Sequence, residues 1–262
     1  MQALRTAATG MAAQQMNVEV ISNNIANMNT VGYKKQRAEF QDLLYQTLQQ
    51  AGAQSSDQGT VVPTGVQIGA GVKAGSVYRI NTQGALTATG NQYDLAINGR
   101  GFFQVLTPTG EIGYSRAGNF STNDQGQLVT QDGYQVQPAI SIPQDATNVT
   151  ISQSGQVQVT QPGATTPSTV GQLELASFTN EGGLSAQGGN LFLQTGASGA
   201  PVTGVPGVQG FGTLMQGYTE ASNVDPVTEI TSLIVAQRAY EMNSKVISTA
   251  DNMLQVANQV KS

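Results

Sequence analysis

The two ends of this chain contain almost no glycine or proline, whereas the middle is rich in both. Of 31 glycines, two lie within residues 1–51 and none follows Gly217, and the prolines run from Pro63 to Pro226. Glycine and proline disfavour helix interiors and mark turns. This distribution predicts helical ends that enclose a turn-rich β middle.

Both ends also carry apolar residues at alternating spacings of three and four, which is the spacing of a heptad seam. Each seam has eight positions and one polar layer, Gln14 or Asn243. We predict an antiparallel two-helix coiled coil that projects from a β body. Two amphipathic helices on an ordinary core are the alternative. The seam positions are Leu4, Ala7, Met11, Gln14, Val18, Ile21, Ile25 and Met28, then Leu233, Ala236, Tyr240, Asn243, Ile247, Ala250, Leu254 and Ala257.

The predicted fold class is therefore α+β, with terminal α-helices in a coiled-coil-like domain and a central, mainly β domain of irregular short strands. Asp225-Pro226 opens the second helix with an N-cap candidate and a proline at the first helical position. Residues 33–50 fit either a helix or an extended segment. The predicted domains are a helical domain (1–50 with 220–262), a linker or extended β region (51–92 with 200–219) and an outer β domain (93–199).

Composition removes several classes of function. Cysteine, histidine and tryptophan are absent, so thiol chemistry, the commonest general base and the strongest zinc ligands are missing. The net charge of −5 argues against a nucleic-acid partner. No segment has the length of a membrane helix or a signal-peptide core, so we expect no membrane insertion and no cleaved signal. We expect no catalytic, cofactor or metal site.

Four local motifs have simpler explanations than ligand binding. Residues 69–75 resemble a phosphate loop but lack a following helix, so a β turn is expected. Residues 123–126 resemble the start of a calcium loop but lack its final glutamate, so we expect a hairpin turn. Glu39 and Asp42 follow the basic cluster of Lys34, Lys35 and Arg37 at near-helical offsets, so the cluster is expected to form a solvated, partly paired face, or to meet an acidic neighbouring subunit. A carboxylate hydrolase would need two of Asp94, Asp124, Asp132 and Asp145 to meet, and nothing in the sequence brings them together.

Longer stretches carry a resemblance to a known family. SNNIANMNTVGYKKQRAEFQDLLYQ (22–46) resembles the N-terminal signature of the flagellar rod, hook and hook-associated axial proteins. DLAINGRGFFQV (94–105) and YSRAGNFSTNDQGQLVTQDGYQVQP (114–138) are similar to their shared β core. VAQRAYEMNSKVISTADNMLQ (235–255) is similar to their C-terminal signature. Residues 45–72 resemble the distal-rod branch of the family. Other rod or hook segments are the alternative within it.

The resemblance implies a structural protein without a cofactor, exported by the flagellar type III apparatus. Family members polymerise with copies of themselves into a helical tube that crosses the periplasm to the outer membrane and transmits motor torque. The terminal helices line the export channel, and the β domain faces outward. The implied partners are proximal rod proteins, hook or hook-junction proteins and the P-ring and L-ring bushing. Residues near 46–63 are implied to make the rod stiff.

The asparagines of the N-terminal signature pose a separate question, because asparagine is a mediocre helix former. We expect their amides to bond neighbouring groups in a packed wall without adding charge, and Gly32 to end the first helix in the left-handed conformation. Residues 1–30 and 228–262 are expected to be disordered in the free subunit. A secreted adhesin with a coiled-coil stalk is the rival function. The predicted polar positions are Asn23, Asn24, Asn27, Asn29, Gly32, Arg238 and Asn243, and the predicted assembly seam is Leu4, Met11, Val18, Ile21, Ile25, Met28, Leu233, Tyr240, Ile247 and Leu254.

Overall fold

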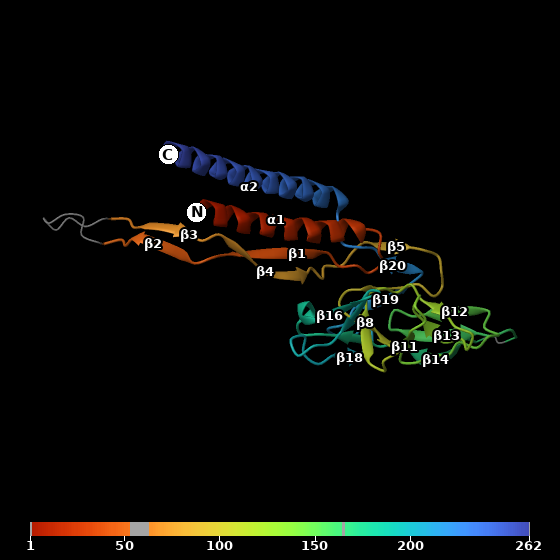
Figure 1. Cartoon of the computed structure of the whole chain (residues 1–262). Helices are drawn as coiled ribbons and strands as arrows, with labels where there is room; N and C mark the ends of the chain where they lie inside the picture. Colours follow the sequence, from red (N-terminus) through yellow and green to blue (C-terminus); the bar gives the residue numbers. More distant parts are fainter. Residues whose placement is uncertain (1, 53–62, 164–165, 262) are drawn as a thin grey trace. The chain divides into compact units, whose positions relative to one another are not determined.

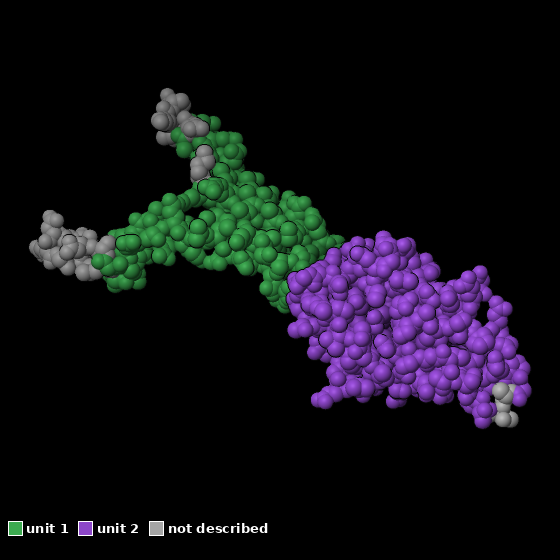
Figure 2. All heavy atoms as spheres, turned by 90° about the horizontal axis from the view of Figure 1, so that it is seen from below, with its two compact units in different colours: residues 1–26, 36–78, 225–262 green, residues 27–35, 79–224 purple. Residues whose placement is uncertain are grey.

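A computed structural model describes residues 2–52, 63–163 and 166–261 of the chain. It has one long helix at each end and short strands between them (Figure 1), so the predicted α+β class is confirmed. Two compact units are present (Figure 2): unit 1 comprises residues 1–26, 36–78 and 225–262, and unit 2 comprises residues 27–35 and 79–224. The three-part division made from the sequence stays a prediction. No described helix is long and apolar enough to cross a membrane.

Unit 1 contains both long helices and two ribbons of paired strands. Helices α1 (Gln2–Ala26) and α2 (Pro226–Lys261) pack along each other (Figure 1). Residues 33–50, which the sequence left open, contain strands and no helix. Along β1 the side chains alternate between half-buried and exposed, the period-two pattern of a strand with one covered face. The paired strands are β1 (Gln36–Asp42) with β4 (Val72–Arg79), and β2 (Tyr45–Gln49) with β3 (Val66–Gly69).

The ends of the two helices follow local chemistry. Asp225 Oδ1 accepts a hydrogen bond of 3.2 Å from the Val227 backbone N–H, which confirms the predicted N-cap ahead of Pro226. Helix α1 ends at Ala26, so Met28, predicted as the last seam position, lies in the following turn. Gly32 has a φ of +70° but stands beyond that turn, so the prediction that it ends the helix is wrong.

Unit 2 is built from short antiparallel strands around one nine-stranded sheet. The sheet's main path is β16 (Ser185–Gly188), β17 (Leu191–Leu193), β8 (Ile112–Ser115), β7 (Phe102–Leu106), β11 (Gln135–Gln137), β10 (Leu128–Val129) and β9 (Ser121–Thr122); β15 (Leu175–Ser177) joins β7 to β18 (Val202–Gly204). Smaller sheets pair β12 (Asn148–Ile151), β13 (Gln156–Thr160) and β14 (Ser168–Gln172), β6 (Leu95–Asn98) with β19 (Thr213–Gln216), and β5 (Leu86–Ala88) with β20 (Tyr218–Glu220).

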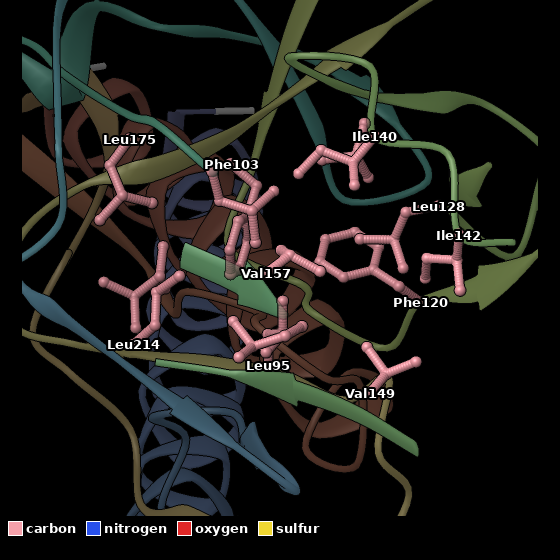
Figure 3. Close-up of a cluster of buried hydrophobic side chains, with 14 of the residues drawn as sticks. Leu95, Phe103, Phe120, Leu128, Ile140, Ile142, Val149, Val157, Leu175 and Leu214 are labelled. Atoms are coloured by element: carbon pink, nitrogen blue, oxygen red, sulfur yellow. The ribbon is translucent and has the colours of Figure 1, made fainter. Parts of the chain in front are cut away.

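Strand β7 divides the core of unit 2, because successive side chains on a strand point to opposite faces. Phe103 belongs to the larger apolar cluster, where its ring meets Phe120 edge-on at 5.0 Å between centroids (Figure 3). Phe102 belongs to a second cluster, where it packs edge-on against Phe178 and Phe192. Both faces of the strand are therefore buried, which makes β7 the fixed centre of the unit.

Candidate assembly surfaces and their polar anchors

The two long helices of unit 1 run antiparallel. Gly10 of α1 lies against Asn243 at the middle of α2, whereas Asn24, near the end of α1, bonds to Glu229 in the first turn of α2. A Cβ on Gly10 would lie 2.9 Å from Asn243 Nδ2, so the missing side chain lets the helices approach closely there. The polar seam position Asn243 thus faces Gly10. Antiparallel pairing of the two helices, as predicted, is confirmed.

The predicted seam marks the face that each helix turns toward its partner. On α2, Ala236 is buried, Leu233, Asn243, Ile247 and Ala250 are half-buried, and Tyr240 and Leu254 are about 40% exposed (42% and 40%). On α1, Ala7 and Ile21 are buried, and Leu4, Met11, Gln14, Val18 and Ile25 are half-buried. The role of these positions in assembly stays a prediction. Sequence reasoning missed a second buried stripe on α1, made of Ala13, Val20 and Asn24, because Ala13 is small and Asn24 is polar, which leaves Val20 as its one large apolar residue.

Asn24 is the anchor of unit 1. Its side chain is buried and pairs with both backbone groups of Gln36, the first residue of β1: Nδ2 donates to the carbonyl at 2.8 Å, and Oδ1 accepts from the N–H at 2.8 Å. Nδ2 also donates to Glu229 Oε2 at 3.1 Å. A single neutral amide therefore joins α1, β1 and the first turn of α2, where the carboxylate of Glu229 complements the helix dipole.

The other polar positions of the family motifs lie nearer solvent. Asn27 Oδ1 accepts a hydrogen bond of 3.2 Å from Thr30 Oγ1 in the turn after α1. Asn23 and Asn29 are exposed, and so is Arg238 on α2. Within one chain, the expectation that these amides bond neighbouring groups in a packed wall therefore fits Asn24 better than the exposed Asn23 and Asn29. In this chain Asn24 alone of the four is fully buried.

Helix α2 carries a long apolar face that α1 does not cover. At 100° per residue, its residues spread over about 160° of the α2 surface, from the side opposite Ala236 to the flank on which Val235 lies. Val227 is 73% exposed, and Val235 and Met242 are each 63% exposed. Exposed apolar surface of this extent marks an interaction site in a water-soluble protein. We call it the outer stripe: Val227, Ile230, Ile234, Val235, Met242, Val246, Met253 and Val256.

Unit 2 has an ionic anchor centred on Glu220, whose side chain is fully buried. Oε1 accepts from Lys34 Nζ at 2.5 Å and from the Gly84 N–H at 2.9 Å, while Oε2 accepts from Arg116 Nε at 3.0 Å. The Arg116 guanidinium also donates to the carbonyls of Gly99 and Gly101. Two cations share one carboxylate here, and carbonyl oxygens take up their remaining donors, as buried charges require.

The environment of Lys34 corrects the expectation of a solvated basic face. Its side chain is 3% exposed, and Nζ donates to the Thr82 carbonyl at 2.8 Å as well as to Glu220. Burial lowers the pKa of Lys34 below its ordinary value of 10.5, and the neighbouring Glu220 carboxylate opposes this shift. Glu39 and Asp42, which lie at helical offsets, are strand residues of unit 1. The acidic partner of Lys34 is instead Glu220, which is distant in sequence.

Further contacts hold residues 27–35 within unit 2. The Gly32 N–H donates to the Glu220 carbonyl at 2.7 Å, and a Cβ on Gly32 would lie 2.6 Å from the Ala117 backbone nitrogen. Asn223 Oδ1 accepts from the Lys35 N–H at 2.7 Å, and its Nδ2 donates to the Ile80 carbonyl at 2.8 Å. Gly32 is therefore required for backbone packing and a positive φ, although it does not cap the helix.

The motifs that resemble ligand loops are structural: residues 69–75 are an extended segment, and residues 123–126 are a hairpin turn. Residues 69–71 join β3 to β4, and the Val72 N–H donates to Thr9 Oγ1 of α1 at 3.3 Å. Asn123 Oδ1 accepts from the N–H groups of Gln125 and Gln127, which closes the hairpin between β9 and β10. The hairpin-turn prediction for residues 123–126 is confirmed, whereas the β-turn prediction for residues 69–75 is wrong, because those residues run extended from β3 into β4. Within the described ranges, no group of three or more Asp or Glu residues is placed to hold a metal ion.

Comparison with known proteins agrees with these features. Three family models match: "Flagella basal body rod protein" over residues 4–34, "Flagellar hook protein FlgE/F/G D1 domain" over 96–159, and "Flagellar basal body rod FlgEFG protein C-terminal" over 215–260. The chain is 70% identical to the flagellar basal-body rod protein FlgG of Caulobacter vibrioides, over 100% of both chains.

The chain belongs to the FlgG family of flagellar basal-body rod proteins. It is also 54% identical to the FlgG protein of Agrobacterium fabrum over 99% of both chains. The match to the FlgF rod protein of Caulobacter vibrioides is weaker, at 37% identity over 88% of this chain and 85% of the other. The chain is thus a structural axial component of the flagellar rod. The N-terminal family match contains both Asn24 and Lys34, and the C-terminal match contains both of their acidic partners, Glu220 and Glu229.

Proposed function

We propose that this chain polymerises with copies of itself into a helical tube that forms the rigid distal rod. In this proposal α1 and α2 form the inner wall around the export channel, and unit 2 faces outward. The outer stripe of α2 carries the proposal, because its apolar side chains remain exposed although the opposite face of α2 packs on α1. Stacked copies make heterologous contacts that do not close, which produces an open helix.

The length of the two helices supports contact between copies. Helix α1 has 25 residues and α2 has 36, and α2 extends past the start of α1 (Figure 1). The last turns of α2 therefore lie beyond the N-terminal end of α1 in unit 1. Met253 and Val256 in this extension are 61% and 58% exposed. An α-helix of this kind is stabilised mainly by tertiary packing, so a second subunit is the expected partner.

The proposed partners and location follow from the family. We propose a non-enzymatic role in the basal body, from the periplasm to the outer membrane, in contact with proximal rod proteins, hook or hook-junction proteins and the P-ring and L-ring bushing. Export through the type III apparatus without a cleaved signal belongs to the same proposal. The stiffening role of residues 46–63 stays a prediction, and most of that segment lies outside the described residues.

Electron microscopy and sedimentation of concentrated protein test the proposal. Wild-type protein is expected to form open filaments that lengthen with concentration. Burying one valine side chain contributes about 1.5–3 kcal/mol, so Val235→Asp should raise the concentration needed for assembly about tenfold or more. Gln237→Asp is the matched control, since it adds the same charge at an exposed polar position of α2.

Two outcomes would contradict the proposal. A closed oligomer of fixed size, unchanged at any concentration, would favour the adhesin-like alternative. Filaments that form equally well with Val235→Asp and Gln237→Asp would show that the outer stripe does not lie between copies. The thermal stability of unit 2, which does not contain α2, checks that neither substitution unfolds the chain outside unit 1.

A further inference from the structure

The dipeptide Asn98-Gly99 is chemically unusual in this chain. It is the one place in the sequence where asparagine precedes glycine. The backbone nitrogen of Gly99 can attack the Asn98 side chain readily, because glycine has no Cβ to hinder the approach. In that reaction the Gly99 nitrogen loses its proton and bonds to Cγ of Asn98, and ammonia leaves. Water then opens the resulting succinimide ring to give aspartate or isoaspartate.

The fold does not allow a slower-reacting residue at position 99. Gly99 has a φ of +114°, which side-chain-bearing residues rarely adopt. A Cβ there would also lie 2.9 Å from Cα of Gly212, the residue that precedes β19, the partner strand of β6. The glycine of the reactive dipeptide is therefore imposed by the geometry of unit 2. Asn98 itself is exposed at the end of β6, where water reaches it.

Gln83 bonds to the backbone on both sides of Asn98. Its Oε1 accepts the Gly99 N–H at 3.0 Å, and its Nε2 donates to the Ile97 carbonyl at 3.2 Å. On the other edge of β6, Asn98 pairs with Thr213 of β19. The backbone around Asn98 is thus held from two sides in the extended conformation, in which the Gly99 nitrogen points away from the Asn98 side chain.

We propose that Asn98 is a latent deamidation site and that Gln83 protects it by holding the Gly99 N–H. The attacking nitrogen must lose its proton and turn toward Cγ, and both changes require that the bond to Gln83 Oε1 breaks. The protection is local, since it depends on one side-chain acceptor. It is independent of how copies of the chain assemble.

Deamidation here would damage the core of unit 2. Isoaspartate adds a methylene group to the main chain at the last residue of β6, next to the residues of that strand that lie in the core. Leu95, Ala96 and Ile97 on the same strand are 0% exposed and pair with β19. A protein that must remain in place for long periods benefits from slowing this reaction at a position where the fold requires the glycine that follows Asn98.

The test is ageing of the full-length protein at neutral pH and 37 °C, followed by peptide mass spectrometry that quantifies isoaspartate and aspartate at residue 98. Gln83→Met removes the acceptor while keeping the side-chain length, and the rate is expected to rise about fivefold, the factor that corresponds to one net hydrogen bond. Gln83→Glu keeps an acceptor oxygen and should age at nearly the wild-type rate. Gln92→Met, at another exposed glutamine of unit 2, is the control and should leave the rate unchanged.

Wild-type protein aged in denaturant supplies the upper limit of the rate. Equal rates in Gln83→Met and wild type would overturn the proposal, because the acceptor would then be irrelevant. Equal acceleration in Gln83→Met and Gln83→Glu would also overturn it, since loss of the Ile97 bond or general loosening would then be the cause. Thermal melting of each variant shows whether unit 2 remains folded during the incubation.

Discussion

Replacing Glu220 by glutamine should expose how strongly unit 2 depends on its ionic anchor. The substitution preserves shape but removes the single negative charge between Lys34 and Arg116, whose side chains are 3% and 5% exposed. Removing one partner of a buried ion pair costs about 3–5 kcal/mol, because the remaining charge stays desolvated without compensation. Here two cations would remain, so we expect about 4 kcal/mol or more.

The assay is thermal or urea unfolding of the full-length chain, followed by the near-ultraviolet signal of the tyrosines of unit 2. For a domain of this size, 1 kcal/mol shifts Tm by about 2–4 °C, so a fall of about 10 °C is expected. Glu181→Gln is the matched control. It breaks an ion pair of similar distance, Arg100 to Glu181 at 3.1 Å, whose arginine side chain is 67% exposed. Exposed pairs contribute about 0–1 kcal/mol, so its Tm should change little.

A second variant separates charge from packing. Adding Lys34→Met to Glu220→Gln removes one of the two uncompensated cations and should recover part of the lost stability. The reasoning is refuted if Glu220→Gln and Glu181→Gln have equal effects. It is also refuted if the double variant is less stable than Glu220→Gln alone, because unpaired charge would then not be the cause of the loss.

Three further outcomes are expected. Gly32→Ala should destabilise unit 2 more than Gly110→Ala in chemical unfolding, by about 1 kcal/mol or more, because both positions have a positive φ but only Gly32 has backbone within 3 Å of the added Cβ. Asn24→Ala should weaken assembly, measured by sedimentation, more than it lowers the Tm of unit 2, because Asn24 lies in unit 1; equal losses would contradict this. Tyr114→Phe should flatten stability against pH above about pH 10. Burial raises the pKa of Tyr114 above 10.0, so the unfolded chain releases that proton first and the stability of the wild type falls as pH rises. The lowered pKa of Lys34 has the opposite effect on stability, but this effect is the same in both proteins and cancels when they are compared.

Local periodicity predicted much of unit 1. The three-and-four spacing identified both helices and the faces they turn to each other, since amphipathic periodicity depends only on neighbouring residues. It extended α1 to Met28, two residues beyond its end at Ala26, because spacing alone does not show where capping stops a helix. It also did not reveal Gly10 as the position opposite Asn243, because register between two helices is a tertiary property.

The polar anchors could not be read from the sequence in the same way. Asn24 looks like Asn23, Asn27 and Asn29, and burial against β1 is what distinguishes it. Lys34 was expected to lie in solvent beside nearby acidic residues, whereas its partner Glu220 is 186 positions away. A cue did exist, because a chain with 10% charged residues places few charges without a structural reason. Helical offset was the wrong criterion, since residues 33–50 contain strands.

The chain passes between the two units at four places, and one of them, between Lys35 and Gln36, gives the sharpest test of when each unit folds. The Lys35 N–H donates to Asn223 of unit 2 at 2.7 Å, and the Gln36 N–H donates to Asn24 of unit 1 at 2.8 Å. If the terminal helices order only on assembly, hydrogen exchange in dilute protein should protect Lys35 and leave Gln36 unprotected. Filaments should protect both.

Two variants make that comparison specific. In filaments, Asn223→Ala should expose the Lys35 amide and leave Gln36 protected, and Asn24→Ala should do the reverse, because each asparagine supplies the acceptor for one of the two amides. Protection of Gln36 in the dilute subunit, equal to that of Lys35, would mean that unit 1 is already folded before copies meet. The burial of the outer stripe would then not be what orders α1 and α2, and assembly would have to join preformed helices.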